Sequence, residues 1–458
     1  MNIIILGAGQ VGFSVATELA REESNEITVI DVDQDILSDL QDRLDLRTIC
    51  GNGSYPSVLK QAGADDADML IALTNSDEIN MIACQVAHSI FHTPTKISRI
   101  RSQEYMQKKE LFGENSIPVD VIISPENLVT EYIHRLIKHP GSLQVLDFAQ
   151  GKVQLVAVKA FHGGPLVGQE IQTIRQHIPG VDMRVAAIFR QGKSLAATAE
   201  QVIEADDEVF FIAAKKHIQT VIAELRRLDK PYKRVMLAGG GNIGGQLALL
   251  LEKNYQVKVI ETDLRRANQL SGELYSSIVL HGDAANPDLL LEENIESMDV
   301  FCALTNDDEA NILSAMLAKR LGARKVMSLI NRPAYVELVE SGLIDIAVSP
   351  HQVTIGAMLA HIRRGDVVAV HALRRGSAEA IEAVAHGDHK TSKVVGRRID
   401  ELKLPKGTII GAIVRGDDVM IAHHDVVVEP EDHVILFITN KRDISQVEKL
   451  FSVPPTFF

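Results

Sequence analysis

The chain has 458 residues, too many for one ordinary domain; 46% of them are hydrophobic and 24% charged, which argues against disorder throughout. Its formal net charge of -14 is repelled by nucleic acid and by anionic lipid, so we predict no nucleic-acid partner and no direct lipid anchor. No uncharged apolar run reaches about 18 residues, and the three cysteines, Cys50, Cys84 and Cys302, are predicted to be small buried hydrophobes.

Short apolar stretches alternate with helical patterns in the first part of the chain. The apolar stretches lie at residues 2–6, 27–30, 69–73 and 97–100. This alternation predicts βαβ units and a parallel sheet. A linking helix is predicted near residues 126–138, because His139-Pro140-Gly141 is a strong helix breaker.

The pattern changes from about residue 140 to residue 227. Residues 153–158, 184–189 and 208–212 are strand-like, and Gly and Pro turns separate them. This stretch predicts a small α+β lobe. Its counterpart runs from about residue 367 to residue 452, after a second linking helix near residues 352–364 that ends at Gly365.

Three blocks of sequence occur twice in the same order. GAGQVG at 7–12 returns as GGGNIG at 239–244, an offset of 239 − 7 = 232. GNGSYPSVL at 51–59 returns as GDAANPDLL at 282–290, and DMLIALTNSDE at 68–78 returns as DVFCALTNDDE at 299–309. The chain is therefore a duplication, with its seam near residues 228–232.

The predicted fold is α/β, with two tandem Rossmann-like doubly wound parallel sheets, each followed by a small α+β lobe. The four lobes are predicted at residues 1–125, 140–227, 232–350 and 367–452.

The first glycine-rich block has the spacing of a dinucleotide-binding turn. Gly7 permits a tight turn, Gly9 lets a pyrophosphate approach the backbone, and Gly12 lets the following helix pack closely. Asp31 ends the second strand, 31 − 12 = 19 residues beyond Gly12, where a carboxylate accepts both ribose hydroxyls. The loop residues Ala8, Gln10 and Val11 complete this candidate site, whose helix N-terminus faces the phosphates.

The second copy offers an equivalent candidate site. Glu261 closes the strand at 257–260. Val32 follows Asp31, and Thr262 follows Glu261, where NADP sites usually have an arginine for the ribose 2′-phosphate. The expected ligand is therefore NAD(H) or another adenine nucleotide with a free ribose. The loop of this copy consists of Gly239, Gly240, Gly241, Asn242, Ile243 and Gly244.

Polar residues follow the next strands in both copies. Thr74-Asn75 and Thr305-Asn306 lie beyond the strands at 69–73 and 300–304, where they contact a ligand or cap the next helix. Arg99 and Arg101 end the following strand and reach either a phosphate or a neighbouring subunit. The second copy has Leu329 and Asn331 there, so the two sites are not chemically equal.

Two other function classes fit the sequence less well. An NAD-dependent oxidoreductase needs a substrate domain with a general acid or base, and the duplication leaves no room for one. His423-His424-Asp425 resembles a metal cluster, but we predict a polar turn between strands at 419–422 and 426–428. A redox-sensing transcriptional repressor needs a basic DNA-binding element, which the sequence does not offer.

GAGQVG with Asp31, LIALTNSDE, GGGNIG with Glu261, and CALTNDDE together resemble the tandem members of the RCK (also called KTN) domain family, over essentially the whole chain. The resemblance implies a regulator, not an enzyme, that lies peripherally on the cytoplasmic face of the bacterial inner membrane. It also implies a homo-oligomeric ring beneath an integral-membrane potassium transporter subunit of the Trk type. The sites implied are Gly7–Val11, Asp31, Thr74, Asn75, Arg99, Gly239–Ile243 and Glu261.

One departure from the family affects the ligand. Some ring-forming relatives place an arginine inside the glycine loop to meet a nucleotide γ-phosphate. Here these positions are Gln10 and Asn242, which leaves NAD(H) against ATP or ADP open.

Overall fold

The computed structural model describes residues 1–20, 25–113, 116–195, 197–226, 230–339, 342, 344–362, 367–373, 378–423 and 425–452. The chain divides into two compact units, Met1–Leu128 with Pro350–Met358, and Val129–Ser349 with Leu359–Phe458. Several predicted features lie outside the described residues: the lobe limit at residue 227, Leu228 and Asp229 of the seam, Gly365 at the end of the second linking helix, and His424.

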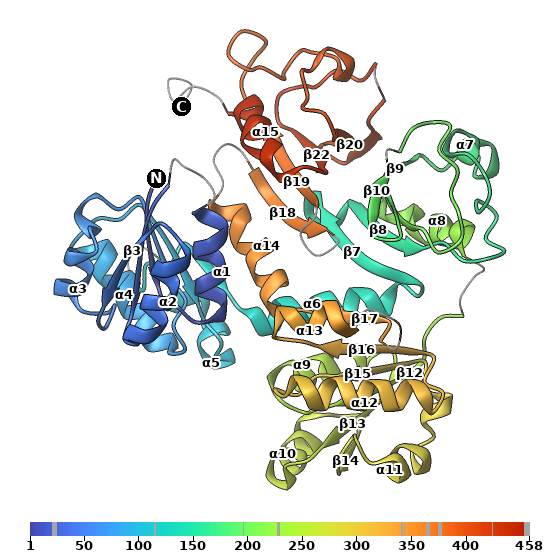
Figure 1. Cartoon of the computed structure of the whole chain (residues 1–458), viewed down its shortest axis with the longest axis horizontal. Coiled ribbons are helices and arrows are strands. Elements are labelled where there is room, and N and C mark those ends of the chain that lie inside the picture. Colours follow the sequence, from blue (N-terminus) through green and yellow to red (C-terminus); the bar gives the residue numbers. More distant parts are fainter. Residues whose placement is uncertain are drawn as a thin grey trace. The chain divides into compact units, whose positions relative to one another are not determined.

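The first unit holds a six-stranded sheet in the order β3-β2-β1-β4-β5-β6. Its strands and helices are blue in Figure 1. All its neighbouring strands pair in parallel. The strand order reverses between β1 and β4, and ligands of doubly wound sheets bind at such a reversal. The elements are β1 (Asn2–Leu6), α1 (Gln10–Leu19), β2 (Glu26–Asp31), α2 (Gln34–Arg43), β3 (Arg47–Cys50), α3 (Pro56–Gln61), β4 (Met69–Ala72), α4 (Asp77–Ser89), β5 (Thr95–Arg99), α5 (Gln103–Met106) and β6 (Val121–Ile123), followed by α6 (Pro125–Lys138).

The second unit contains a sheet of the same order, β14-β13-β12-β15-β16-β17. Its strands also pair in parallel. Its elements are β12 (Arg234–Ala238), α9 (Asn242–Leu251), β13 (Gln256–Glu261), α10 (Leu264–Glu273), β14 (Ile278–His281), α11 (Pro287–Glu292), β15 (Val300–Ala303), α12 (Asp308–Arg320), β16 (Lys325–Leu329), α13 (Pro333–Val339) and β17 (Ile346–Val348). The helix α14 (Pro350–Ile362) follows β17 in the chain, and its residues Pro350–Met358 belong to the first unit.

Two antiparallel five-stranded sheets complete the second unit, in the orders β10-β9-β11-β8-β7 and β18-β19-β22-β20-β21. The first comprises β7 (Ser142–Phe148), β8 (Val153–Lys159), β9 (Met183–Arg190), β10 (Lys193–Leu195) and β11 (Glu208–Ala214), with α7 (Ile174–His177) and α8 (Ile218–Leu225). The second comprises β18 (Val367–Leu373), β19 (Ala378–Ala385), β20 (Thr408–Arg415), β21 (Asp418–Ile421) and β22 (Asp432–Ile438), with α15 (Ile444–Phe451).

These two antiparallel sheets pack face to face over one apolar core. Phe148, Phe210 and Ile212 of one sheet join Ala380 and Phe437 of the other in a single buried cluster. The sheets approach so closely that a Cβ at Gly411 of β20 would lie 3.1 Å from a methyl group of Ile212. The two small lobes therefore form one β-sandwich.

Each small lobe also contains the same buried ion pair. Arg190 donates from Nε and Nη2 to the two carboxylate oxygens of Asp207, at 2.8 and 2.9 Å. Arg415 does the same to Asp432, at 2.8 Å for both bonds. Both aspartates are fully buried, so each pair is a bidentate bond that fixes the same turn in both lobes.

The predicted fold class is confirmed, and most predicted strands lie where the apolar stretches indicated. The predicted strand at 426–428 is wrong, because the described part of this stretch makes only one isolated bridge, between Arg398 and Val427. Cys84 and Cys302 are buried as predicted, but Cys50 is exposed because it ends β3, an edge strand. The limits of the four lobes remain a prediction.

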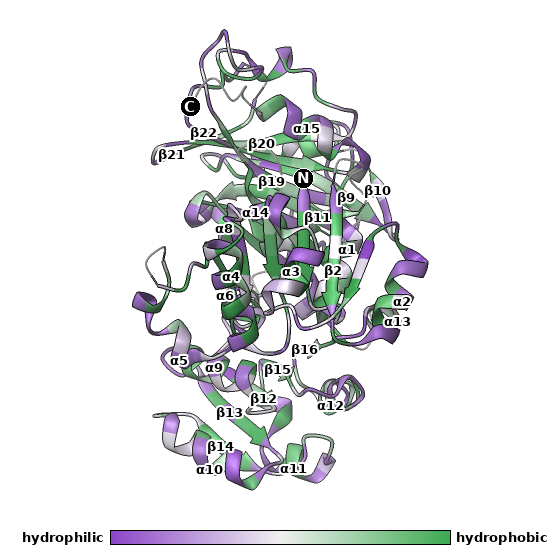
Figure 2. Ribbon diagram, turned by 90° about the vertical axis from the view of Figure 1, so that its left-hand side faces the viewer, coloured by the Kyte–Doolittle hydropathy of each residue, from purple (hydrophilic) through white to green (hydrophobic). Residues whose placement is uncertain are grey.

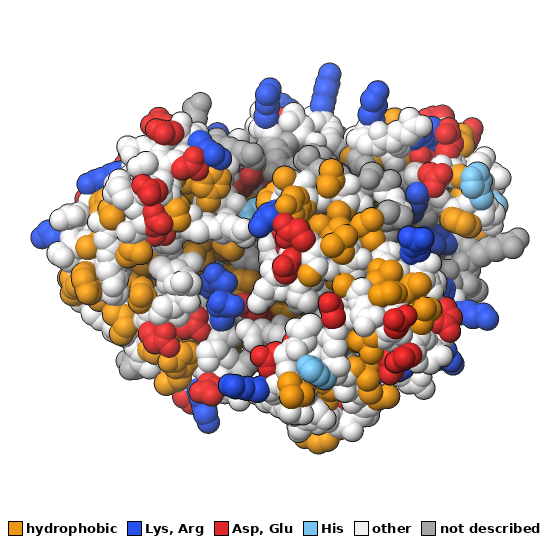
Figure 3. All heavy atoms as spheres, turned by 60° about the horizontal axis from the view of Figure 1, so that its bottom comes forward, with side chains coloured by type: hydrophobic (Ala, Val, Ile, Leu, Met, Phe, Trp, Pro, Cys, Tyr) orange, Lys and Arg blue, Asp and Glu red, His pale blue; other side chains and the backbone are white. Residues whose placement is uncertain are grey.

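Hydrophobic residues concentrate on the strands, and hydrophilic residues lie on the helices, as β13 and α10 illustrate (Figure 2). On the face shown in Figure 3, acidic and basic side chains are interspersed with hydrophobic ones. Among the described helices, none is long and apolar enough to cross a membrane.

Candidate functional site

The first glycine loop adopts a backbone that only glycine accommodates. Gly7 has a φ of +95°, and a Cβ there would lie 3.0 Å from the carbonyl of Leu73. A Cβ at Gly12 would lie only 1.8 Å from the main-chain oxygen of Gly7. Gly12 therefore lets α1 pack against the turn itself, while Gly9 faces open space with no heavy atom within 4 Å of its would-be Cβ.

The second loop repeats this geometry. Gly239 has a φ of +103°, and a Cβ there would lie 3.1 Å from the carbonyl carbon of Leu304. A Cβ at Gly244 would lie 1.9 Å from the oxygen of Gly239, and Gly241 faces open space. Both copies thus keep the strand-turn-helix shape in which a phosphate can approach the backbone.

The helices that follow these loops start without a side-chain cap. The N-cap residues are Gly9 for α1 and Gly241 for α9, and neither helix start receives a side-chain hydrogen bond. Gln10 and Asn242 begin the helices and are exposed. The first turn of each helix therefore presents main-chain N–H groups at the edge of the crevice, where an anion is favoured.

Asp31 holds the first glycine loop. Its Oδ2 accepts a hydrogen bond from the main-chain N of Ala8 at 2.6 Å, and its Oδ1 accepts one from the main-chain N of Asp33 at 3.0 Å. A carboxylate has about four lone-pair sites, so acceptor capacity remains for ribose hydroxyls.

Glu261 does the same in the second copy. Its Oε2 accepts from the main-chain N of Gly240 at 2.7 Å, and its Oε1 accepts from the main-chain N of Asp263 at 2.8 Å. The structure thus brings both predicted acids to the glycine loops and gives each a supporting role that the sequence did not predict.

Thr74 lies beside the first glycine loop, with its main-chain N 3.1 Å from the position of a Cβ at Gly7, but its polar atoms are largely engaged within the protein. Its main-chain N and its hydroxyl both donate to Oδ1 of Asn80, at 3.0 and 2.7 Å. The Ser76 hydroxyl accepts from the main-chain N of Ile79 and so caps α4. Asn75, next to Thr74, is exposed.

The second copy has the same arrangement. The main-chain N and the hydroxyl of Thr305 donate to Oδ1 of Asn311, at 2.8 and 2.7 Å. Asp307 caps α12 by accepting from the main-chain N of Ala310.

The fully buried amides Asn80 and Asn311 were not predicted as part of the site. Asn80 donates to the main-chain oxygen of Arg99 at 2.9 Å, and Asn311 donates to that of Leu329 at 3.0 Å. Each therefore ties the loop after one strand to the last residue of the next strand. The available signal was their equal spacing from Thr74 and Thr305, six residues in each copy.

The arginines that end β5 have different surroundings. Arg101 donates from Nε to Oε1 of Glu126 at 2.7 Å, while its main-chain N donates to Asp77 at 2.9 Å. Burial lowers the pKa of the Arg99 guanidinium, and its buried Nε has no hydrogen-bond partner. Arg99 is thus the guanidinium with an unused donor at this edge of the sheet.

The second copy lacks both guanidinium groups at this edge. Leu329 takes the place of Arg99, because it accepts from Asn311 as Arg99 accepts from Asn80. Asn331 takes the place of Arg101, because its main-chain N donates to Asp308 at 2.8 Å. The predicted inequality of the two sites is present in the geometry.

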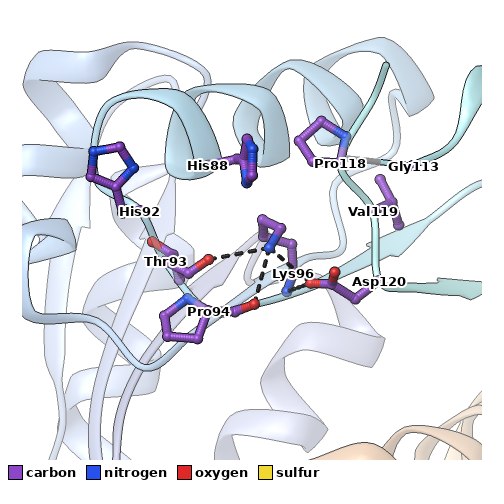
Figure 4. A pocket seen from close by; sticks show the side chains of 9 residues that line it. All are labelled: His88, His92, Thr93, Pro94, Lys96, Gly113, Pro118, Val119 and Asp120. Carbon is purple, nitrogen blue, oxygen red and sulfur yellow. Dashed lines mark hydrogen bonds and ion pairs between the residues drawn. The ribbon is translucent and has the colours of Figure 1, made fainter. Parts of the chain in front are cut away.

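A pocket of ≈ 340 Å³ lies at the opposite edge of the first sheet, at the amino ends of β5 and β6 (Figure 4). The Lys96 ammonium at its base donates to the oxygens of Thr93 and Pro94, at 3.2 and 3.0 Å, and pairs with Asp120 at 2.9 Å. Because an ammonium has three donors, this lysine is fully engaged within the protein. The lining residues are His88, His92, Thr93, Pro94, Lys96, Gly113, Pro118, Val119 and Asp120.

In the histidine-rich stretch near residue 423, His423 faces an acidic side chain. Nε2 of His423 lies 3.5 Å from a carboxylate oxygen of Asp182, and His424 is outside the described residues. Among the residues that the structure describes, no group of three or more metal-binding side chains is gathered.

Comparison with known proteins matches two family models, each of them twice. The TrkA-N domain matches residues 3–125 and 235–350, and the TrkA-C domain matches residues 155–226 and 389–452.

Similar full-length relatives are Trk system potassium uptake proteins TrkA. The protein from Halomonas elongata is 62% identical over 458 residues, and that from Vibrio alginolyticus is 59% identical, with 100% of each chain covered in both cases. A homologue from Archaeoglobus fulgidus is 31% identical, over 98% of this chain and 100% of its own.

Solved structures with a similar fold include the GsuK RCK domain, with a TM-score of 0.61 and 18% identity over 98% of this chain and 94% of that one. The GsuK channel bound to NAD also has a TM-score of 0.61, with 17% identity over 98% of this chain and 78% of that one. At these identities the likeness concerns the fold.

Proposed function

The chain belongs to the TrkA family of Trk system potassium uptake proteins, and from this premise we propose that it is a regulatory subunit that gates a Trk-type potassium transporter through nucleotide-dependent conformational change. It acts as a homo-oligomeric ring, peripherally, on the cytoplasmic face of the membrane. It does not catalyse a reaction.

The observation that supports this proposal most is the repeated crevice. Each copy has a glycine loop open to an anion at Gly9 or Gly241, and an acid, Asp31 or Glu261, hydrogen-bonded to that loop. These parts hold the pyrophosphate and the ribose of an adenine nucleotide. NAD(H) is the expected ligand, with ATP or ADP as the alternative.

The remaining predicted site residues divide by their surroundings. Gln10, Val11, Asn242 and Ile243 offer main-chain N–H groups to the phosphates. The hydroxyls of Thr74 and Thr305 donate to Asn80 and Asn311, which fixes the loops that border the nucleotide sites. These loops contact the ligand from the side. Arg99 supplies a positive charge to the first site only.

Binding energy can shift a conformational equilibrium only if the nucleotide binds two shapes unequally. A tenfold difference in affinity supplies about 1.4 kcal/mol per site. These free energies add over the two sites of each chain and over the chains of a ring. The bonds from Asn80 and Asn311 link the loop beside each nucleotide site to the last residue of the next strand, β5 or β16. A change in the conformation of one loop can therefore be transmitted to the neighbouring strand.

The test measures potassium flux in proteoliposomes that hold the transporter and this protein, with NADH, NAD, ATP or ADP added in turn. We expect flux to depend on the nucleotide, and Asp31→Ala to weaken binding at the first site about tenfold while the second site is kept. Glu261→Ala is the matched variant for the second site. Equal flux under all four nucleotides, with binding verified by calorimetry, contradicts the mechanism.

A further inference from the structure

The second crevice contains an arginine at its adenosine end that has no equivalent in the first. Nε of Arg266, in the first turn of α10, donates to the main-chain oxygen of Gly240 at 2.8 Å. A Cβ at Gly245 would lie 2.9 Å from Nη2 of the same guanidinium. Gly240 and Gly245, which are not part of the nucleotide-binding glycine motif, thus leave space for this side chain beside the loop that is hydrogen-bonded to Glu261.

The guanidinium is positioned from a second direction. Nη1 of Arg266 lies 3.5 Å from a carboxylate oxygen of Glu273, seven residues further along the same helix, and the side chain is 29% exposed. Its charge is therefore held beside the crevice and is still accessible to a ligand.

The first copy fills the equivalent positions differently. Ala8 and Phe13 stand where the second copy has Gly240 and Gly245, and Ile36 stands where it has Arg266. Arg43, at the position of Glu273, lies with its guanidinium carbon 5.9 Å from the centroid of the Phe13 ring. The first crevice is therefore bordered by an aromatic and an aliphatic side chain. At the C-terminal end of the next helix, the first copy has a positive charge, Arg43, where the second has a negative one, Glu273.

The segments that receive the adenosine ribose differ in formal charge. Residues 31–36, DVDQDI, contain three aspartates and no cation, for a charge of -3. Residues 261–266, ETDLRR, contain one glutamate, one aspartate and two arginines, for a charge of −2 + 2 = 0. An additional phosphate on the adenosine ribose meets repulsion at the first site and a guanidinium at the second.

We propose that the second site also accepts an adenine dinucleotide with a phosphate on its adenosine ribose, through Arg266, whereas the first site excludes it. This inference rests on the proposed function, since it assumes that both crevices bind nucleotides. It revises the expectation from Glu261 alone, because the guanidinium of Arg266 is bonded to the main-chain oxygen of Gly240, the residue whose main-chain N donates to Glu261.

The experiment titrates the full chain with NADPH and, separately, with NADH in a calorimeter. We expect NADH to bind at two sites and NADPH at one. Arg266→Ile, which installs the residue of the first copy, should weaken NADPH binding at least tenfold and NADH binding far less. The NADH titration also shows that the variant is folded.

Arg320→Ile, at an exposed position on α12, is the control for the same change in net charge and should leave both titrations as they are. NADPH binding at both sites, or an Arg266→Ile variant that binds NADPH as the parent does, overturns the inference. NADH binding without any NADPH binding overturns the inference and leaves the proposed function standing. Binding of no nucleotide at either site overturns the proposed function itself.

Discussion

The side-chain amide of Asn80 donates a hydrogen bond to the main-chain oxygen of Arg99 at 2.9 Å, and so joins the loop after β4 to the last residue of β5. The same amide donates to the main-chain oxygen of Thr74 at 3.2 Å, while its Oδ1 accepts from the main chain and the hydroxyl of Thr74. One buried side chain therefore satisfies polar groups of the loop after β4 and of the last residue of β5.

Asn80→Ala should lower the free energy of unfolding by about 2–3 kcal/mol, since each buried polar group left unpaired costs about 1–3 kcal/mol. Asn311→Ala should cost a similar amount, because Asn311 makes four hydrogen bonds equivalent to those of Asn80. Urea denaturation measures both. Asn75→Ala, at an exposed position in the same loop, should change stability by less than about 0.5 kcal/mol. A loss at Asn75 equal to that at Asn80 contradicts this assignment.

Glycines of the same loop should respond differently to an added methyl group. Gly12→Ala places a Cβ 1.8 Å from the Gly7 oxygen and should destabilise the protein by about 1–3 kcal/mol or more through overpacking. Gly9→Ala adds its methyl group to open space, so the protein should fold normally but bind nucleotide more weakly at the first site. Thermal unfolding and calorimetric titration separate the two effects. Equal melting temperatures for both variants argue against the packing role of Gly12.

The bidentate pair in each small lobe should contribute strongly to stability. Asp207→Asn removes the charge from the bidentate bond to Arg190 at a site where the aspartate is fully buried, and leaves Glu204 as the remaining carboxylate partner of Arg190. It should cost about 2–3 kcal/mol, within the range for hydrogen bonds to charged groups. Asp432→Asn tests the second lobe. As a control, Asp400→Asn breaks the exposed pair with Arg398, which should cost less than about 1 kcal/mol. Chemical denaturation measures the free energy of unfolding of each variant. Similar decreases for Asp207→Asn and Asp400→Asn would contradict a strong contribution from the bidentate pair.

Two histidines of the second unit should make stability depend on pH. Burial lowers the pKa of His371 from 6.5 to about 4, and burial likewise lowers the pKa of His139 from 6.5 to about 4. Between these pH values the unfolded chain binds protons that the native chain does not, so the free energy of unfolding falls as pH falls from 6.5 toward 4.

The His371→Gln variant checks this prediction, because glutamine keeps a donor but does not titrate. Denaturation at several pH values between 4 and 7 should show a smaller pH dependence for the variant than for the parent. His162→Gln, at an exposed position, serves as control. An unchanged pH dependence in His371→Gln means that other groups cause it.

Local sequence patterns predicted the parallel sheets well. The apolar run before the first glycine loop predicted β1 with its observed bounds, because the strand and turn signals lie next to one another in the chain. The strand predicted at 426–428 is wrong, because three consecutive valines also suit a short segment that pairs only locally, here with residues 396–399 around one isolated bridge. Cys50 differs from its prediction because burial depends on whether a strand is central or at the edge.

The parts of the site that escaped prediction depend on distant residues. Asn80 is a helical residue by pattern, and its role arises only when β4 and β5 lie side by side. Arg266 occupies its niche because Gly240 and Gly245, on another helix and its loop, leave space for it. The pairing of Arg190 with Asp207 requires the register of β9 against β11. Such contacts follow from tertiary structure and not from neighbours in the sequence.

The common core of the two antiparallel sheets has a consequence for how the chain can evolve and be expressed. Phe148 and Phe210 from the first repeat are covered by residues of the second repeat, such as Phe437. Half a chain, cut at the seam, would leave one apolar sheet face in water and would need to recruit another half before it became soluble. Splitting the gene therefore yields fragments that must associate, and a relative with a single repeat must form at least a dimer to hide the same surface.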